Sequence, residues 1–116
     1  MRIAVTGVCA SGKTTLVNSL RNHAVEAYNI AQEHSNIQTL WQKKNPDILV
    51  MLDATLPSIR RRRKVAWGQE RLIVQKQRLA HARQHVDLFI QTDALTKEGV
   101  AKLVLIFLQH FKRVKA

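Results

Sequence analysis

Apolar residues occur along this chain in short runs that are separated by longer polar stretches. Runs at residues 3–5, 48–52 and within 86–93 predict buried strands, because a parallel strand covered on both faces is apolar throughout. The first run is followed closely by Gly7. A fourth strand is predicted at residues 24–32, although the alanines of this segment are also compatible with a helix.

Helical spacing of apolar residues is found between and after these runs. Residues 14–20 carry one apolar face, and residues 36–42 predict a short helix that ends before a proline. A last helix begins after Thr96, its expected N-cap. The apolar stripe of this last helix consists of Val100, Leu103, Val104, Phe107 and Phe111.

A long basic helix is predicted at residues 56–85. Thr55 is its expected N-cap, and Pro57 is tolerated in its first turn, where the backbone N–H has no intrahelical partner. We expect an interruption near residues 67–68, where a glycine follows a tryptophan.

The alternation of strands and helices predicts a single α/β domain that spans residues 1–116. We expect about four parallel strands, with helices on both faces of the sheet and the strand at residues 3–5 in its interior. A chain of 116 residues with 46% apolar residues is large enough to bury one hydrophobic core. No internal repeat or interdomain linker interrupts it.

The balance of charges limits the classes of partner. Nineteen basic and eight acidic residues give a formal net charge of +11, which favours polyanions such as nucleotides, phosphorylated substrates or nucleic acid. No apolar run reaches the roughly 18 residues of a membrane span, so no membrane partner is expected. No secretory leader is visible, and a single cysteine is compatible with the reducing cytoplasm, where we expect the protein.

One short motif carries most of the functional information. Gly7 and Gly12 enclose four residues, and Lys13 and Thr14 follow directly, as in the phosphate-binding P-loop. Glycines allow the backbone to curl round a phosphate, so that successive N–H groups at a helix N-terminus form an anion cradle. Lys13 would bridge the terminal phosphates and Thr14 would ligate Mg²⁺. The predicted nucleotide-binding residues are Gly7, Ala10, Ser11, Gly12, Lys13, Thr14 and Thr15.

Residues 5–16, 46–55 and 87–104 together resemble the small P-loop kinases, the group of nucleoside, nucleotide, shikimate and gluconate kinases. The P-loop is the specific motif in this resemblance, and the two later segments match in pattern only. The resemblance implies a three-layer α/β/α P-loop NTPase fold, Mg²⁺ and ATP as cofactor and substrate, and phosphoryl transfer to a small acceptor.

In the kinase group an arginine-rich helix forms a mobile lid over the phosphates. The resemblance therefore assigns lid arginines to residues 60–63 and a base-side loop to residues 92–95. Guanidinium groups suit this task because they direct hydrogen bonds at phosphate oxygens. Consecutive helical residues point 100° apart, so at most two of the four arginines can face the phosphates. We select Arg60 and Arg63 as catalytic candidates, with a solvated basic surface as the alternative.

A carboxylate is also expected near the metal. Glu33 and Asp53 each end a predicted strand. In the kinase group the strand beside the P-loop strand usually carries the metal-side or catalytic carboxylate, which favours Glu33 if residues 24–32 form that strand. Glu33 would then orient metal-bound water or accept a substrate proton, together with Thr14 at the metal.

One feature departs from the kinase pattern. Only residues 34–46 are available for a substrate-binding insert, so no full insert is expected. Within this segment His34 and Trp41 are candidates to line a small site. A tryptophan such as Trp41 is, however, more typical of the hydrophobic core. A short segment is compatible with a small acceptor. The alternatives are that a partner completes the site, or that the protein hydrolyses nucleotide or merely binds it. A nucleotide-dependent nucleic-acid-binding module is the alternative from another class, although aromatic residues for base stacking amount to only 5%.

Overall fold

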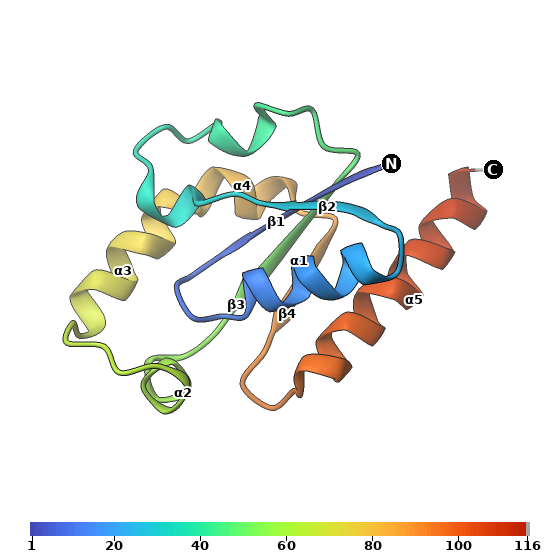
Figure 1. The fold of residues 1–116 in the computed structure, drawn as a ribbon. Coiled ribbons are helices and arrows are strands. Elements are labelled where there is room, and N and C mark those ends of the chain that lie inside the picture. Colours follow the sequence, from blue (N-terminus) through green and yellow to red (C-terminus); the bar gives the residue numbers. More distant parts are fainter. Residues whose placement is uncertain (116) are drawn as a thin grey trace.

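The chain folds around a four-stranded sheet in a computed structural model that describes residues 1–115 (Figure 1). The order of the strands is β2-β1-β3-β4, and every neighbouring pair is parallel. Strand β1, which leads into the glycine-containing loop, is therefore interior, as predicted. The strands are β1 (Arg2–Gly7), β2 (Glu26–Asn29), β3 (Ile48–Asp53) and β4 (Leu88–Gln91).

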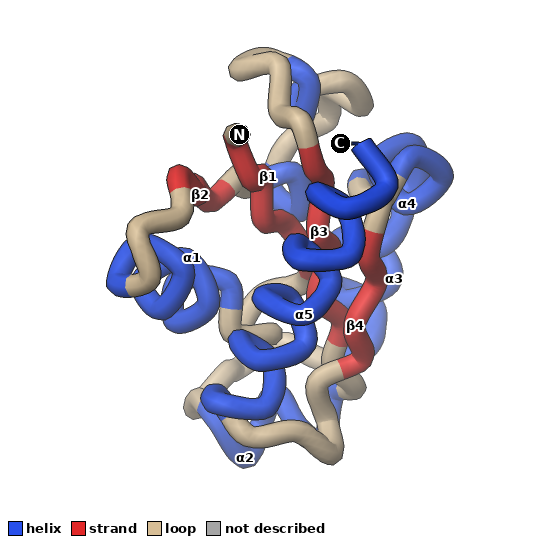
Figure 2. Tube along the Cα trace, turned by 90° about the vertical axis from the view of Figure 1, so that its right-hand side faces the viewer, coloured by secondary structure: helices blue, strands red, loops and turns tan. Residues whose placement is uncertain are grey.

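Helices cover both faces of this sheet. Helices α1 and α5 lie on one side of it, and α3 and α4 lie on the other (Figure 2). This arrangement is compatible with the expected α/β/α layers. The helices are α1 (Lys13–Asn22), α2 (Leu56–Arg62), α3 (Gln69–Arg78), α4 (Ala80–His85) and α5 (Lys97–Lys115), with short 3₁₀ turns η1 (Gln32–His34) and η2 (Leu40–Gln42).

The two faces of the sheet hold separate hydrophobic clusters, because side chains alternate along a strand. In β3, Val50 and Leu52 point to the cluster that includes Leu20 of α1 and Val104 of α5. The neighbouring residues of β3 point the other way, to the cluster that includes Leu72 of α3. Burial on both sides accounts for the continuous apolar run of this strand.

Some predicted elements are shorter or divided in the structure. Strand β2 covers only Glu26–Asn29 of the predicted residues 24–32, because Ala24 has a φ of +59° in the preceding turn and η1 follows. Within the predicted short helix at residues 36–42, only the turn η2 forms. The basic helix is interrupted between Arg62 and Gln69, as predicted, and again at Leu79, which packs into the second cluster.

The two predicted N-caps behave differently. Thr96 Oγ1 accepts a hydrogen bond from Gly99 N at 2.9 Å and so caps α5 as expected. Thr55 occupies the N-cap position of α2, but its hydroxyl donates to Asp93 Oδ2 at 2.6 Å and makes no capping bond to the helix. Pro57 lies in the first turn of α2, as predicted.

Among residues 1–115, no helix combines the length and the apolarity needed to cross a membrane.

Candidate functional site

The loop between β1 and α1 adopts a conformation that requires its two glycines. Gly7 has a φ of +145° and Gly12 a φ of +104°, and both values are open to glycine but unfavourable for other residues. A Cβ atom at Gly7 would lie 2.0 Å from the carbonyl oxygen of Leu52, so β1 and β3 approach too closely for a side chain. At Gly12 there is open space, and the backbone conformation alone demands glycine.

A cleft of about 480 Å³ opens at this loop. It lies at the carboxyl ends of the parallel strands, where α/β proteins bind their ligands. Its lining residues are Cys9, Ala10, Ser11, Gly12, Lys13, Thr14, Thr15, Leu16, Asn29, Glu33, His34, Arg62, Arg63, Thr92, Leu95, Thr96, Lys97 and Val100.

The cleft gathers most of the predicted site residues. All of the predicted nucleotide-binding residues except Gly7 line it, and so do Glu33 and Arg63. Gly7 lies beneath the loop, against β3. Arg60 and Asp53 are not among the lining residues. His34 lines the cleft, whereas Trp41 is buried in the second hydrophobic cluster.

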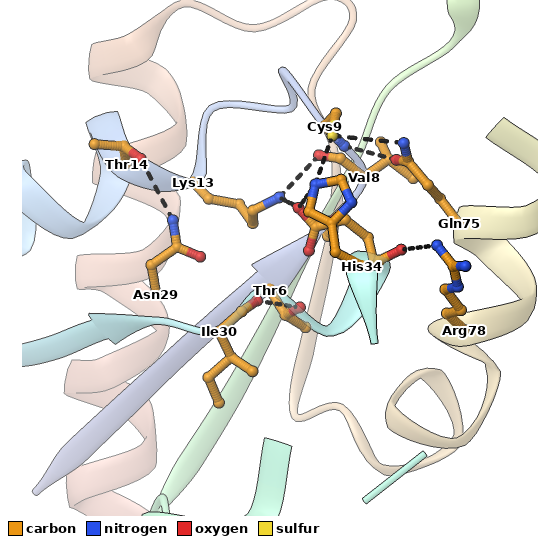
Figure 3. Close-up of polar contacts among 12 residues, drawn as sticks. Thr6, Val8, Cys9, Lys13, Thr14, Asn29, Ile30, His34, Gln75 and Arg78 are labelled. Atoms are coloured by element: carbon orange, nitrogen blue, oxygen red, sulfur yellow. Dashed lines mark hydrogen bonds and ion pairs between the residues drawn. The ribbon is translucent and has the colours of Figure 1, made fainter. Parts of the chain in front are cut away.

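Lys13 is buried and fully engaged at the floor of the cleft, with 8% of its surface exposed. Its ammonium group donates to the carbonyl oxygens of Gly7 at 2.8 Å and Val8 at 3.2 Å, and to Glu33 Oε2 in an ion pair. A buried charge is costly unless it is paired and hydrogen-bonded. The loop carbonyls and Glu33 meet both requirements, so the ammonium group is held beside the loop (Figure 3).

Glu33 is as buried as its partner but is less completely satisfied. It is 3% exposed, and its Oε2 lies 3.7 Å from His34 Nε2 as well as beside Lys13. Its other oxygen, Oε1, is buried without a hydrogen-bond partner among the residues that the structure describes. Buried carboxylate oxygens are usually paired. The free oxygen therefore marks a place where a further donor or cation would be favourable.

Asp53, the other carboxylate candidate, has different surroundings. Its Oδ1 lies 4.0 Å from Lys76 Nζ, at the limit of an ion pair, and its backbone oxygen accepts a hydrogen bond from Thr92 Oγ1 at 3.0 Å. The geometry therefore brings Glu33, and not Asp53, to the glycine-containing loop.

The turn η1 that carries Glu33 is anchored on both sides. Gln32 is completely buried, and its amide donates to the carbonyl oxygen of Ile37 at 2.7 Å and accepts from Trp41 N at 3.0 Å. Arg78 of α3 donates to the carbonyl oxygen of Glu33 at 3.3 Å. These contacts fix the backbone that presents Glu33 and His34 to the loop.

Gln75 of α3 is a site residue that sequence reasoning missed. It is 1% exposed, its Oε1 accepts from Cys9 N at 3.0 Å, and its Nε2 donates to Cys9 Sγ at 3.5 Å (Figure 3). The available signal was its helical spacing from Leu72 and Leu79, which places a polar side chain on the buried face.

The four consecutive arginines separate in space. Arg62 donates to Thr92 O at 2.7 Å, to Thr92 Oγ1 at 2.9 Å and to Ala10 O at 3.2 Å, and so joins the end of β4 to the loop. Of the four, Arg62 and Arg63 line the cleft. Arg60 is exposed and approaches Gly68, and its catalytic role stays a prediction.

Two hydroxyl groups of the loop have unused hydrogen-bonding capacity. Ser11 Oγ is buried without a partner among the described residues. Thr14 Oγ1 lies at the cleft and accepts a long hydrogen bond of 3.4 Å from Asn29 Nδ2. Both hydroxyl groups belong to the segment at which α1 begins, where the helix dipole favours negative charge.

Comparison of the chain with protein-family models found no match, and comparison with curated proteins found none either. The assignment of a function therefore depends on the geometry of the cleft and the pattern of the loop.

Proposed function

We propose that the protein is a P-loop protein of kinase-like type, which binds Mg²⁺-ATP in the cleft and transfers a phosphoryl group to a small acceptor. The observation that carries this proposal is the loop itself, in which two glycines with positive φ precede a buried lysine and a helix N-terminus. Consecutive backbone N–H groups at a helix start are suited to bind phosphate, and the dipole of α1 adds to their effect.

The groups left unpaired in the cleft fit a magnesium nucleotide. Ser11 Oγ is a buried donor without an acceptor, and Glu33 Oε1 is a buried acceptor without a donor. We assign the phosphates to the backbone N–H groups of residues 10–15 and to Lys13, and the metal to Thr14 and Glu33. Mg²⁺-ATP, when bound, supplies the phosphoryl group and neutralises part of its charge.

The chain's own residues then have distinct tasks. Lys13 holds positive charge at the terminal phosphates, and Arg63 closes over them from the end of α2. Glu33 either orients a water of the metal or accepts the proton of the acceptor hydroxyl at Oε1. Arg62 has a positioning task, because its three hydrogen bonds join the loop to Thr92.

The proposed acceptor is small. Residues 34–46 contain only the end of η1 and the turn η2, and Trp41 of η2 packs against the core. This segment offers no second domain for a large substrate.

The chain's one cysteine is unpaired, which supports a reducing, cytoplasmic setting for the activity.

The test is Lys13→Ala, with the exposed Lys102→Ala as the charge-matched control. Mg²⁺-ATP at 100 times its dissociation constant should stabilise the wild type and the control by about 2.7 kcal/mol. Lys13→Ala should show no such gain, because the ammonium group at the phosphates is lost. Thermal melts with and without nucleotide measure the nucleotide-induced stabilisation of each protein separately. The lower intrinsic stability of the variant therefore does not affect the comparison.

Equal nucleotide-induced shifts in Lys13→Ala and the wild type would contradict the P-loop assignment. The absence of any shift in the wild type, for ATP and GTP alike, would reject nucleotide binding altogether.

A second candidate is supported by charges that lie outside the cleft. Arg60, Arg61 and Lys64 are exposed and do not line it, so they are accessible to a polyanion such as nucleic acid. Binding to DNA or RNA that falls steeply with salt concentration would favour a nucleotide-dependent nucleic-acid-binding module over the kinase-like activity.

A further inference from the structure

Three metal-ligating side chains from two distant segments meet at one edge of the cleft. Cys9 lies in the loop after β1, and Glu33 and His34 lie in η1 after β2. Their sulfur, oxygen and nitrogen ligand atoms are all within 4.8 Å of one another. The proposed phosphoryl transfer uses Glu33 but gives no task to Cys9 or His34, so the cluster calls for a separate explanation.

We propose that Cys9, Glu33 and His34 form a binding site for a transition-metal ion of the Zn²⁺ type, with one coordination position open to the cleft. Thiolate, imidazole and carboxylate together are a donor set typical of zinc, whereas Mg²⁺ prefers oxygen ligands alone. The site is distinct from the magnesium position assigned to Thr14, although both positions draw on Glu33.

The distances within the cluster suit a tetrahedral ion. With metal–ligand bonds of about 2.0 to 2.3 Å, neighbouring ligand atoms of a tetrahedral zinc site lie about 3.3 to 3.6 Å apart. Cys9 Sγ lies 3.2 Å from His34 Nε2, and His34 Nε2 lies 3.7 Å from Glu33 Oε2. The third pair, Cys9 Sγ and the Glu33 carboxylate, lies within 4.8 Å. Side-chain movements that bring the carboxylate toward the sulfur would close the site round a metal ion.

The unpartnered oxygen of Glu33, which the magnesium assignment also uses, is a second observation that indicates a ligand at this carboxylate. Glu33 is 3% exposed, and its Oε1 has no hydrogen-bond partner among the described residues. Lys13 supplies one positive charge to Oε2. A divalent cation beside the carboxylate would satisfy the remaining oxygen, and coordination by the Cys9 sulfur would release the thiol proton to solvent.

Neighbouring residues hold the ligands in position. Gln75 bonds both the backbone N–H and the sulfur of Cys9, and Arg78 donates to the backbone oxygen of Glu33. Both residues come from α3, which lies beside the cluster, to the right in Figure 3. Such outer contacts are typical of metal sites, where they orient the ligands. The His34 side chain is 54% exposed, which leaves the site accessible from solvent.

The test titrates untagged, nucleotide-free protein with Zn²⁺ by calorimetry and with Co²⁺ by absorption spectroscopy. We expect one ion per chain and a thiolate-to-cobalt charge-transfer band. Cys9→Ser should abolish that band, and Cys9→Ser and His34→Gln should each weaken zinc binding by at least about 100-fold, since each removes a ligand. His85→Gln, which removes one of the two neighbouring histidines on α4, should leave the affinity unchanged.

Lys13→Met supplies a second readout. It removes the ammonium group that competes for Glu33, so zinc should bind at least as tightly as in the wild type, while ATP binding should be lost. Failure of nucleotide binding and failure of the metal site are therefore distinguishable.

Three results would overturn the metal site. They are the absence of stoichiometric zinc binding, a cobalt complex without the thiolate band, and zinc binding that depends on His85 and not on Cys9 and His34.

Discussion

Lys13 and Glu33 form the pair on which the cleft depends. Their side chains are 9% and 4% exposed, so each charge relies on the other in place of water. Removing one member of a buried pair typically costs about 3–5 kcal/mol, because the remaining charge is left uncompensated. Variants at this pair therefore change stability as well as function, and conservative substitutions separate the two effects better than alanine does.

Glu33→Gln is the sharper test of the proposed catalysis. Glutamine keeps an oxygen that accepts from Lys13, so binding of Mg²⁺-ATP should largely persist. Turnover should fall by about 10²–10⁴-fold, because the amide cannot accept a proton. Nucleotide titration and a phosphate-release or acceptor assay measure the two quantities.

Asp53→Asn is the matched control, since Asp53 is the last residue of β3 and does not line the cleft. Loss of turnover in Asp53→Asn, with normal turnover in Glu33→Gln, would show that the wrong carboxylate has been selected.

At the scale of elements, two polar side chains join segments that meet at the carboxyl ends of the strands. Arg62, the last residue of α2, binds Thr92 after β4 and Ala10 in the loop. Asp93 binds both the backbone N–H and the hydroxyl of Thr55, where α2 begins. Both ends of α2 are therefore fastened to the segment between β4 and α5, which helps to shape the cleft.

The contact between Asp93 and Thr55 predicts a pH dependence of stability. Desolvation by burial would raise the pKa of Asp93, but hydrogen bonds from Thr55, Gln91 and Ser58 outweigh it and hold this pKa well below the ordinary 3.8. A lowered folded-state pKa means that ionised Asp93 stabilises the fold above pH 3.8, and that this contribution is lost as the pH falls further.

Asp93→Asn should therefore be less stable than the wild type at pH 7, with a difference that narrows below pH 3.8. Urea unfolding at several pH values measures the difference. Gln91→Ala removes one of the three side chains whose hydrogen bonds lower this pKa, together with the acceptor of the Asp93 N–H, and should have a smaller effect. A difference between Asp93→Asn and the wild type that is independent of pH would contradict the assignment.

For the whole molecule, the strand order determines which segments can meet. Strand β1 lies between β2 and β3, so the segments that follow β1 and β2 are adjacent although Cys9 and His34 are 25 residues apart. Helix α5 returns across the sheet and packs against α1 in the first hydrophobic cluster. The cleft is thus held in place by this core, to which two of its lining residues, Leu16 and Val100, belong.

Leu108→Ala tests the contribution of α5 to this core. Leu108 is 5% exposed, so its truncation should lower the free energy of unfolding by about 2–5 kcal/mol. Leu103→Ala, on the same helix but 44% exposed, should change it by less than about 0.5 kcal/mol. Equal losses in chemical denaturation would indicate that the outer face of α5 is also covered in solution.

Periodicity predicted the alternation of strands and helices, because burial leaves a local pattern of apolar residues. The glycine after Trp67 predicted the break in the basic helix. The pattern of Gly7, Gly12 and Lys13 also predicted a loop conformation that glycine alone adopts readily. These features depend on neighbours in the sequence, and a local pattern is sufficient to recognise them.

Only the tertiary structure decided which arginines line the cleft, that Glu33 pairs with Lys13, and that Cys9 meets His34 and Gln75. The end of β2 and the division of the helix at Leu79 were likewise beyond local pattern. Each depends on the twist and packing of elements far apart in the chain. The sequence by itself determined the local conformations and the chemical groups available, whereas long-range packing decided which of those groups come within bonding distance.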